Sequence, residues 1–302
     1  DMTQPKVTVL MSVLNGEDYL REAIDSVLAQ TFTDFEFLII DNASTDGTTA
    51  IIASYGDARI RYIRNDSTLT LTQSLNKGLE IAQGTYVARL DADDIAMPDR
   101  LQAQASYLDT RPEVALVASA WTDFFGKGIS RQTPGPIPPS DHQDLITALA
   151  ESNVLAHSSL MFRRDAVCTV GGYPEEFAYA MEYALYFKLA AYHRLGSLPK
   201  ALVAMRNHEG QVTNRAALRA EHLLEEYRIA AKATRSPALD AIGQRRALRK
   251  QVKMMVQLSV THFHNRRIAA AACWLSRGFI TSPGIFLCLI GRLIPTAADR
   301  GA

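Results

Sequence analysis

The chain has 302 residues, enough for one large domain or for a domain with a smaller appendage. A composition of 47% apolar and 21% charged residues is typical of a folded globular protein and argues against intrinsic disorder. The net charge of zero hides an acidic first part, residues 1–214 with 17 Lys and Arg against 27 Asp and Glu, which argues against nucleic acid as a partner.

Residues 7–90 alternate between β-branched apolar runs and segments with apolar residues at helical spacing. The pattern predicts strands at residues 7–13, 35–40, 60–63 and 86–90, and helices at 18–30, 48–55 and 72–82. Strands that alternate with helices indicate βαβ units. We therefore expect an α/β fold with a mostly parallel sheet flanked by helices.

Polar residues lie at the ends of three of these predicted strands. The pairs are Ser12 with Asn15, Asp41 with Ser44, and Asp91 with Asp93. Such residues are common in turns, so one cluster alone would carry little weight. Ligands of parallel α/β sheets bind beyond the carboxyl ends of the strands, and three clusters at one edge favour a binding site there.

The segment Asp91-Ala92-Asp93 directly follows the fourth predicted strand. Two carboxylates two residues apart in an extended turn can face one side and offer hard oxygen ligands to Mn²⁺ or Mg²⁺. The tripeptide occurs by chance in many loops, but its position after a buried strand favours a metal site. A cation there would offset the charge on a departing diphosphate.

The character of the chain changes after Thr213, where Arg- and Ala-rich helical sequence begins. We therefore expect a first domain at residues 1–214 and a helical C-terminal appendage at 215–302. The appendage carries 15 Lys and Arg against 5 Asp and Glu, with a charged helical face at 245–253 and an apolar stretch at 274–294. A buried helical hairpin and an interfacial, peripheral membrane element both fit this pattern.

Several ordered segments resemble the family 2 inverting glycosyltransferases with the GT-A, Rossmann-like fold. They are VTVLMSVLNGEDYLREAIDSVLAQTFTDFEFLIIDNASTDGT, LTQSLNKGLEIAQGTYVARLDADDIAMPDRLQAQ, HSSLMFRRDAVCTVGGYPEEF and MRNHEGQVT. The resemblance covers about residues 5–214. It implies transfer of a sugar from a nucleotide-diphosphate donor, with Mn²⁺ or Mg²⁺ as cofactor.

The resemblance also implies roles for individual residues. Asp41 would accept hydrogen bonds from the nucleobase, with Ser12 and Asn15 nearby and Gln73 where the family usually has Lys. Asp91 would hold the ribose or orient the metal shell. Asp93 would ligate the metal, and His208 would be a further ligand, although a surface-loop histidine is the alternative.

The resemblance also implies a catalytic base, at a position where this sequence differs from the family pattern. The family usually presents Glu-Asp at the start of a helix, and the corresponding residues here are Met181-Glu182. Glu182 would take the proton of the acceptor hydroxyl, although its extra methylene displaces the carboxylate by about 1 Å. On the acceptor side we expect His157, Arg163 and Tyr183. Solvated ion pairs for the arginine and core packing for the tyrosine are the alternatives.

These features predict non-processive transfer, most readily from a UDP-sugar, to a glycan or lipid-linked acceptor in cell-surface polysaccharide synthesis. The processive Gln-x-x-Arg-Trp motif is absent, while Leu14 and other departures weaken the expectation of uracil specificity. A nucleotidyltransferase and a non-catalytic sugar-nucleotide-binding module are the alternatives. Three scattered cysteines and no basic-then-apolar start predict a cytoplasmic location, at the inner face of the membrane if the appendage binds lipid.

Overall fold

The computed structural model describes residues 4–129, 132–208 and 218–291. It forms two compact units, one from residues 1–146 with 153–210 and the other from 147–152 with 211–302. The domain boundary expected near residue 214 lies outside the described residues.

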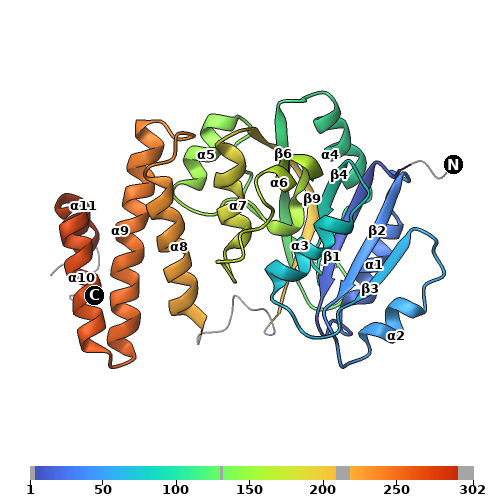
Figure 1. Cartoon of the computed structure of the whole chain (residues 1–302), viewed down its shortest axis with the longest axis horizontal. Coiled ribbons are helices and arrows are strands. Elements are labelled where there is room, and N and C mark those ends of the chain that lie inside the picture. Colours follow the sequence, from blue (N-terminus) through green and yellow to red (C-terminus); the bar gives the residue numbers. More distant parts are fainter. Residues whose placement is uncertain (1–3, 130–131, 209–217, 292–302) are drawn as a thin grey trace. The chain divides into compact units, whose positions relative to one another are not determined.

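The first half of the sheet follows the predicted alternation. Its strands are β1 (Val7–Val13), β2 (Phe35–Asp41), β3 (Ile60–Arg64) and β4 (Tyr86–Arg89). They lie in the order β3-β2-β1-β4 and are all parallel, as the blue strands of Figure 1 show. Their carboxyl ends therefore share one edge, as the sequence predicts.

The second half of the sheet is mixed in direction. It contains β5 (Ile95–Ala96), β6 (Val114–Phe125), β7 (Gln132–Pro134), β8 (Met161–Arg163) and β9 (Arg194–Asn207). Strand β8 runs antiparallel between β4 and β6, whereas β6 and β9 are parallel to each other. The short β5, which follows β4 in the chain, pairs with the long β9 through Ile95 and Ala204. The end of β9 therefore lies near the edge where β4 ends.

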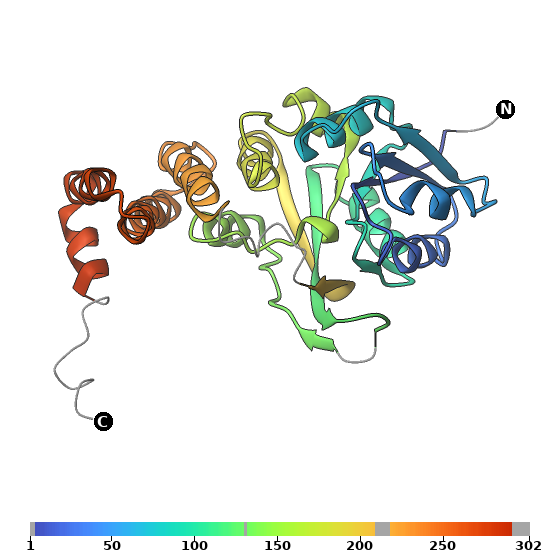
Figure 2. The ribbon, with the colours of Figure 1, turned by 90° about the horizontal axis from the view of Figure 1, so that it is seen from below.

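Helices cover the sheet. They are α1 (Leu20–Leu28), α2 (Thr48–Ala53), α3 (Leu71–Ile81), α4 (Arg100–Asp109), α5 (His142–Leu149), α6 (Arg164–Thr169) and α7 (Met181–Ala190), with a 3₁₀ turn η1 (His157–Ser159). The apolar side of α1 packs with alternate residues of β1 and β2 and with α4 in one buried cluster. Helix α3 approaches β1 closely because Gly78 has no side chain, and a Cβ there would lie 2.4 Å from Leu10 Cδ1. Figure 2 shows the sheet from a second side.

The second unit is helical, as expected for the appendage. Its helices are α8 (Arg219–Ala233), α9 (Ala241–His264), α10 (Ile268–Thr281) and α11 (Pro283–Gly291). Leu223, Met254 and Leu258 form a buried cluster between α8 and α9, and Lys250 pairs with Glu226 at 3.2 Å. None of the described helices is both long enough and apolar enough to cross a membrane.

Candidate active site

Hydrogen bonds tie the loops after β1 and β2 together. Asn15 adopts a left-handed backbone with φ 54°, and its backbone N–H donates to Ser44 Oγ at 2.9 Å. Its side-chain Oδ1 accepts from the backbone N–H of Thr45 at 2.8 Å. Asn15 therefore lies at the predicted edge, where it fixes the neighbouring loop.

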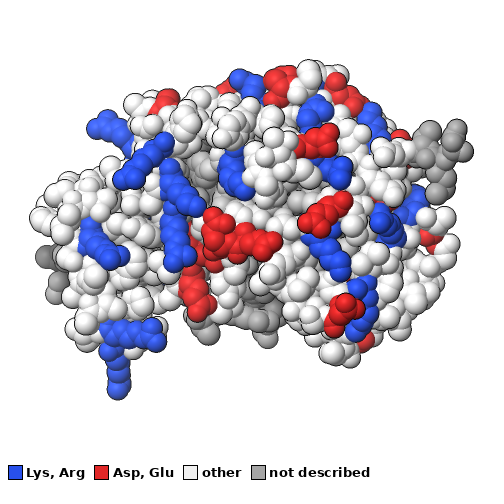
Figure 3. Space-filling model, in the orientation of Figure 1, with Lys and Arg blue, Asp and Glu red and all other residues white. Residues whose placement is uncertain are grey.

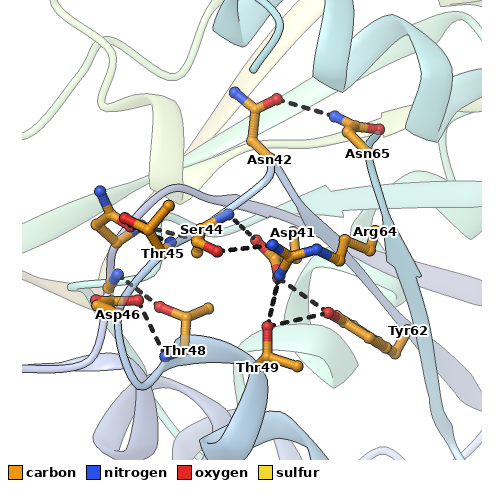
Figure 4. Close-up of polar contacts among 12 residues, drawn as sticks. Asp41, Asn42, Ser44, Thr45, Asp46, Thr48, Thr49, Tyr62, Arg64 and Asn65 are labelled. Carbon is orange, nitrogen blue, oxygen red and sulfur yellow. Dashed lines mark hydrogen bonds and ion pairs between the residues drawn. The ribbon is translucent and has the colours of Figure 1, made fainter. Parts of the chain in front are cut away.

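Asp41 is fully buried at the end of β2 and accepts hydrogen bonds from the protein itself (Figure 4). Its donors are Ser44 N at 2.8 Å, Thr49 Oγ1 at 3.0 Å, Tyr62 OH at 2.9 Å and Arg64 Nη1 at 2.8 Å. Burial opposes ionisation, but hydrogen bonds led by Ser44 outweigh it and lower the pKa of Asp41. A carboxylate has about four acceptor sites. In this structure the Asp41 oxygens hold the loop, so the expectation that Asp41 accepts from a nucleobase stays a prediction that requires one of these donors to move.

Ser12 and Gln73 each make hydrogen bonds at the amino end of α3. The hydroxyls of Ser12 and Ser74 are 2.8 Å apart and buried. Gln73 Oε1 accepts from Thr70 N at 3.1 Å, while Thr70 Oγ1 accepts from Gln73 N at 3.2 Å, which is a capping box. Both residues lie near the carboxyl edge of β1. Gln73 is exposed, and its side chain caps the amino end of α3.

Three carboxylates gather after β4, and each has a different partner. Asp91 forms an ion pair with the buried Arg89 and accepts from Ser158 Oγ at 2.9 Å. Asp94 is buried and accepts from Ser158 Oγ and from Arg206 N, the latter at 2.9 Å. Asp93 Oδ2 lies 2.9 Å from His208 Nε2. The Asp-x-Asp run is thus extended by a third acid that the sequence reasoning did not single out.

The crowding of these acids shifts their titration. Burial and the charges of Asp93 and Asp91 raise the pKa of Asp94 well above its ordinary value. Burial and Asp91 likewise raise the pKa of Asp93. Burial opposes ionisation of Asp91 too, but the Arg89 guanidinium outweighs it and lowers the pKa of Asp91. Burial and the neighbouring carboxylates therefore make ionisation of Asp93 and Asp94 costly, and a bound cation would favour the ionised form of both.

Arg206 anchors this acidic run from β9. Its guanidinium is fully buried, donates to Asp93 O at 2.8 Å and to Glu22 Oε2 at 3.0 Å, and lies over the rings of Tyr19 and Phe124. His208 follows two residues later, with its ring 4.9 Å from that of Tyr19. Sequence reasoning missed Arg206, although its place beside His208 in the MRNH segment was visible.

Asp93 and His208 suit a shared divalent cation. Two ligands at adjacent positions around Mn²⁺ or Mg²⁺ lie about 3 Å apart when each bond is about 2.1 Å, and their atoms are 2.9 Å apart here. Both side chains are partly exposed, at 27% and 22%. Within the described ranges no group of three His, Cys, Asp or Glu side chains forms a ligand set. An ion at this pair would need oxygens from a phosphate or water, as Mg²⁺ sites in nucleotide-using proteins commonly do.

Glu182 lies in the first turn of α7, where its Oε1 accepts from Asn153 Nδ2 at 3.2 Å. Behind it the hydroxyl of the buried Tyr173 is 2.9 Å from His157 Nε2. Burial and the charges of Glu182 and Asp91 all raise the pKa of Tyr173, against the opposing effect of Arg89. Tyr173 and His157 therefore lie near both carboxylates, and they connect α7 with the acidic run after β4.

Two expected acceptor-side residues lie elsewhere. Arg163 pairs with Tyr86 at the start of β4, the sheet edge opposite Asp91. Its guanidinium donates to the carbonyls of Val114 at 2.9 Å and Leu108 at 2.7 Å, so it serves packing. Tyr183 is only 1% exposed and its ring packs on Phe187. The sugar-facing interpretation of both residues is wrong in this structure, because neither side chain reaches the acidic edge or the surface there.

Known proteins resemble this chain in sequence and in fold. Residues 8–169 match the family model described as glycosyl transferase family 2. An uncharacterized glycosyltransferase of Haemophilus influenzae is 31% identical over 220 residues, which are 70% of this chain and 68% of that protein. EpsE of Bacillus subtilis, which bears a glycosyltransferase name, is 34% identical over 174 residues. That match covers 56% of this chain but only 60% of EpsE.

Two solved structures share the fold at low identity. TarS 1–349 of S. aureus in complex with UDP-GlcNAc has a TM-score of 0.64 and 19% identity, over 86% of this chain and 73% of that one. The mannosyltransferase PcManGT of Pyrobaculum calidifontis, in complex with GDP-Man and Mn²⁺, has a TM-score of 0.62 and 19% identity, over 97% and 81%. The family match covers more than half of the chain, and the Haemophilus influenzae relative is matched over more than two thirds of its length. The chain belongs to glycosyl transferase family 2.

Proposed function

We propose that the protein transfers one sugar, with inversion and with a divalent cation, from a nucleotide-diphosphate donor to a glycan or lipid-linked acceptor in cell-surface polysaccharide synthesis. The observation that carries the proposal is the Asp93–His208 pair at the carboxyl edge of the sheet. The pair offers a carboxylate and an imidazole at a spacing that suits one cation, beside the further acids Asp91 and Asp94. Mn²⁺ or Mg²⁺ held there would stabilise the negative charge of the diphosphate leaving group.

The reaction needs a base opposite the leaving group. The acceptor hydroxyl oxygen forms the new bond to the anomeric carbon, and the bond from that carbon to the diphosphate oxygen breaks with its electron pair. Glu182 receives the hydroxyl proton. Its partly exposed place in the first turn of α7, near the Tyr173 and His157 side chains that also adjoin Asp91, supports this role.

The donor is proposed as a UDP-sugar, with a GDP-sugar as the first alternative. UDP-GlcNAc is bound by TarS and GDP-Man with Mn²⁺ by PcManGT. In this chain Asp41 is occupied by protein donors, so base recognition would rest on backbone groups of the loops after β1 and β2 or on a rearranged Arg64. We propose no nucleic-acid partner, because residues 1–214 are acidic. We also propose a cytoplasmic location, because the three scattered cysteines suit a reducing compartment.

Glu182→Gln tests the assignment. We expect donor hydrolysis and sugar transfer to fall about 100-fold or more, because the base is lost while the size of the side chain is kept. Donor affinity, measured calorimetrically with Mn²⁺, should remain unchanged. Glu175→Gln is the matched control, since Glu175 is an exposed carboxylate a few residues before the same helix. NMR of the product's anomeric proton reports inversion.

A non-catalytic nucleotide-sugar-binding module is the second candidate, favoured by Met181-Glu182 in place of the family's Glu-Asp. Tight, Mn²⁺-dependent donor binding with no turnover by the unmodified protein would establish that module and overturn the enzymatic proposal. Turnover that survives in Glu182→Gln would instead move the base to another residue.

A further inference from the structure

The last helices of the second unit carry apolar side chains on their outer surface. Ile280 is 78% exposed, Phe263 63% and Leu287 60%. Ile268, Leu275 and Phe279 are exposed as well. Scattered apolar residues are normal on protein surfaces, but six exposed large apolar side chains within residues 263–287 exceed that background and suit an interaction surface.

The same part of the chain is uniformly basic. Residues 241–291 contain eight Lys and Arg and no Asp or Glu. Arg266, Arg267 and Arg277 are exposed in the same stretch of the chain as these apolar residues. In Figure 3 the surface over α10 and α11, at the far left, shows only uncharged residues with Lys and Arg. We call the six apolar residues and these three arginines the apolar-basic face.

The last two helices of this face, α10 and α11, are too short to cross a bilayer. Helix α10 has 14 residues and α11 has 9, with Pro283 between them, whereas a spanning helix needs about 20. Short helices with exposed apolar side chains and flanking arginines suit a position in the plane of the interface. Arginine stems can cover the apolar boundary while their guanidinium groups reach lipid phosphates.

We propose that the apolar-basic face binds the surface of an anionic lipid bilayer. The apolar side chains would enter the boundary between headgroups and acyl chains, and the arginines would contact the phosphates. A second copy of the chain is a poorer occupant, because a two-fold contact would bring two carboxylate-free basic surfaces together. Lipid binding is separate from the transfer reaction, so its test needs no sugar donor.

The test is flotation of the full chain with vesicles of phosphatidylcholine alone and of phosphatidylcholine with about 30 mol% phosphatidylglycerol. We expect binding to the anionic vesicles and little binding to the neutral ones. Ile280→Ser and Arg267→Glu should each weaken the partition coefficient about tenfold. Arg267 precedes the first turn of α10, where a carboxylate is favourable for the helix, so a loss of binding in that variant would not arise from unfolding.

Matched controls change equally exposed side chains away from the face. Tyr192→Ser removes a ring that is 78% exposed in the first unit, and Arg228→Glu reverses an exposed charge on α8. Neither should alter flotation. The proposal is overturned if the unmodified chain binds neither vesicle, or if all four variants bind alike. It is also overturned if Ile280→Ser only converts a dimer to a monomer in light scattering, because the occupant is then a second copy.

Discussion

Two buried arginines, Arg89 and Arg206, bind different acids of the run after β4. Arg89 pairs with Asp91, and the backbone N–H of Arg206 binds Asp94 while its guanidinium holds the carbonyl of Asp93. The carboxylate of Asp93 is thereby left to face His208. Of the three acids, Asp93 is the one whose carboxylate lies against a histidine, which is itself a metal-ligand type, and we therefore propose that the cation binds there rather than at Asp91.

His157 should make stability depend on pH. Burial and the nearby Arg89 lower its pKa to about 3, against the opposing charge of Asp91 and an ordinary value of 6.5. Below pH 6.5 the unfolded chain therefore binds a proton that the folded chain does not, so stability falls as pH decreases. We expect a loss of about 2 kcal/mol between pH 6.5 and 4.5 from this residue.

Urea unfolding at both pH values measures the effect, with His157→Gln as the variant. The variant should lose less stability on acidification than the unmodified protein. His142→Gln is the comparison, because burial also lowers the pKa of His142 but to a smaller degree. An acid-induced loss that is identical in His157→Gln and the unmodified protein would show that His157 is protonated in the folded state.

The residue types in the sequence indicated candidate site residues. They did not indicate which polar atoms of those residues hydrogen-bond to other parts of the protein. Asp91, Asp93 and His208 were predicted from their order and lie at one edge. Asp41 was also predicted, yet its role depends on Tyr62 and Arg64, which come from a strand whose pairing register the sequence alone did not fix. Arg206 was missed because a buried arginine is identified by the packing around it.

At the scale of elements, the loop after β2 contains a strained residue. Ala43 has φ 63°, a left-handed conformation that costs an L-residue about 1–2 kcal/mol and glycine little. Glycine has its own entropic cost of about 0.5–1 kcal/mol. We therefore expect Ala43→Gly to stabilise the protein by about 0.5–1 kcal/mol, as measured by the urea midpoint.

Ala50→Gly is the matched control for this loop. Ala50 is exposed in the helix α2 that follows it, and glycine in a helix interior should cost about 1 kcal/mol. Opposite signs for the two substitutions would locate the strain at Ala43. A loss of stability in both variants would mean that the loop does not hold a left-handed residue.

The sequence pattern predicted the strands of one half of the sheet but not those of the other half. The parallel strands β1–β4 were predictable because helices separate them and because each is a short β-branched run. The mixed half was not, since β8 has only three residues and β6 pairs with strands on both sides. Strand direction there follows from long connections through α5, α6 and α7, and no local signal encodes it.

At the scale of the whole molecule, the two units have separate cores and opposite charge. The first unit is built around the sheet and its acidic edge, and the second around α8, α9 and Trp274. Units with their own cores can unfold in separate steps. The proposed donor site uses residues of the first unit only, the loops after β1 and β2 with Asp93 and His208, so ligand binding should act on one step and not on the other.

Differential scanning calorimetry with Mn²⁺ and UDP-GlcNAc or GDP-mannose tests this division. A ligand at about 100 times its Kd stabilises the folded state by about 2.7 kcal/mol, which for a domain of about 200 residues raises Tm by about 5–10 °C. We expect the transition of the first unit to shift by this amount and that of the second to stay in place. Asp93→Asn should abolish the shift, whereas Asp165→Asn, which changes an exposed carboxylate on α6, should retain it. A single transition that moves as a whole would show one cooperative body, and a shift that persists in Asp93→Asn would remove the cation from the Asp93–His208 pair.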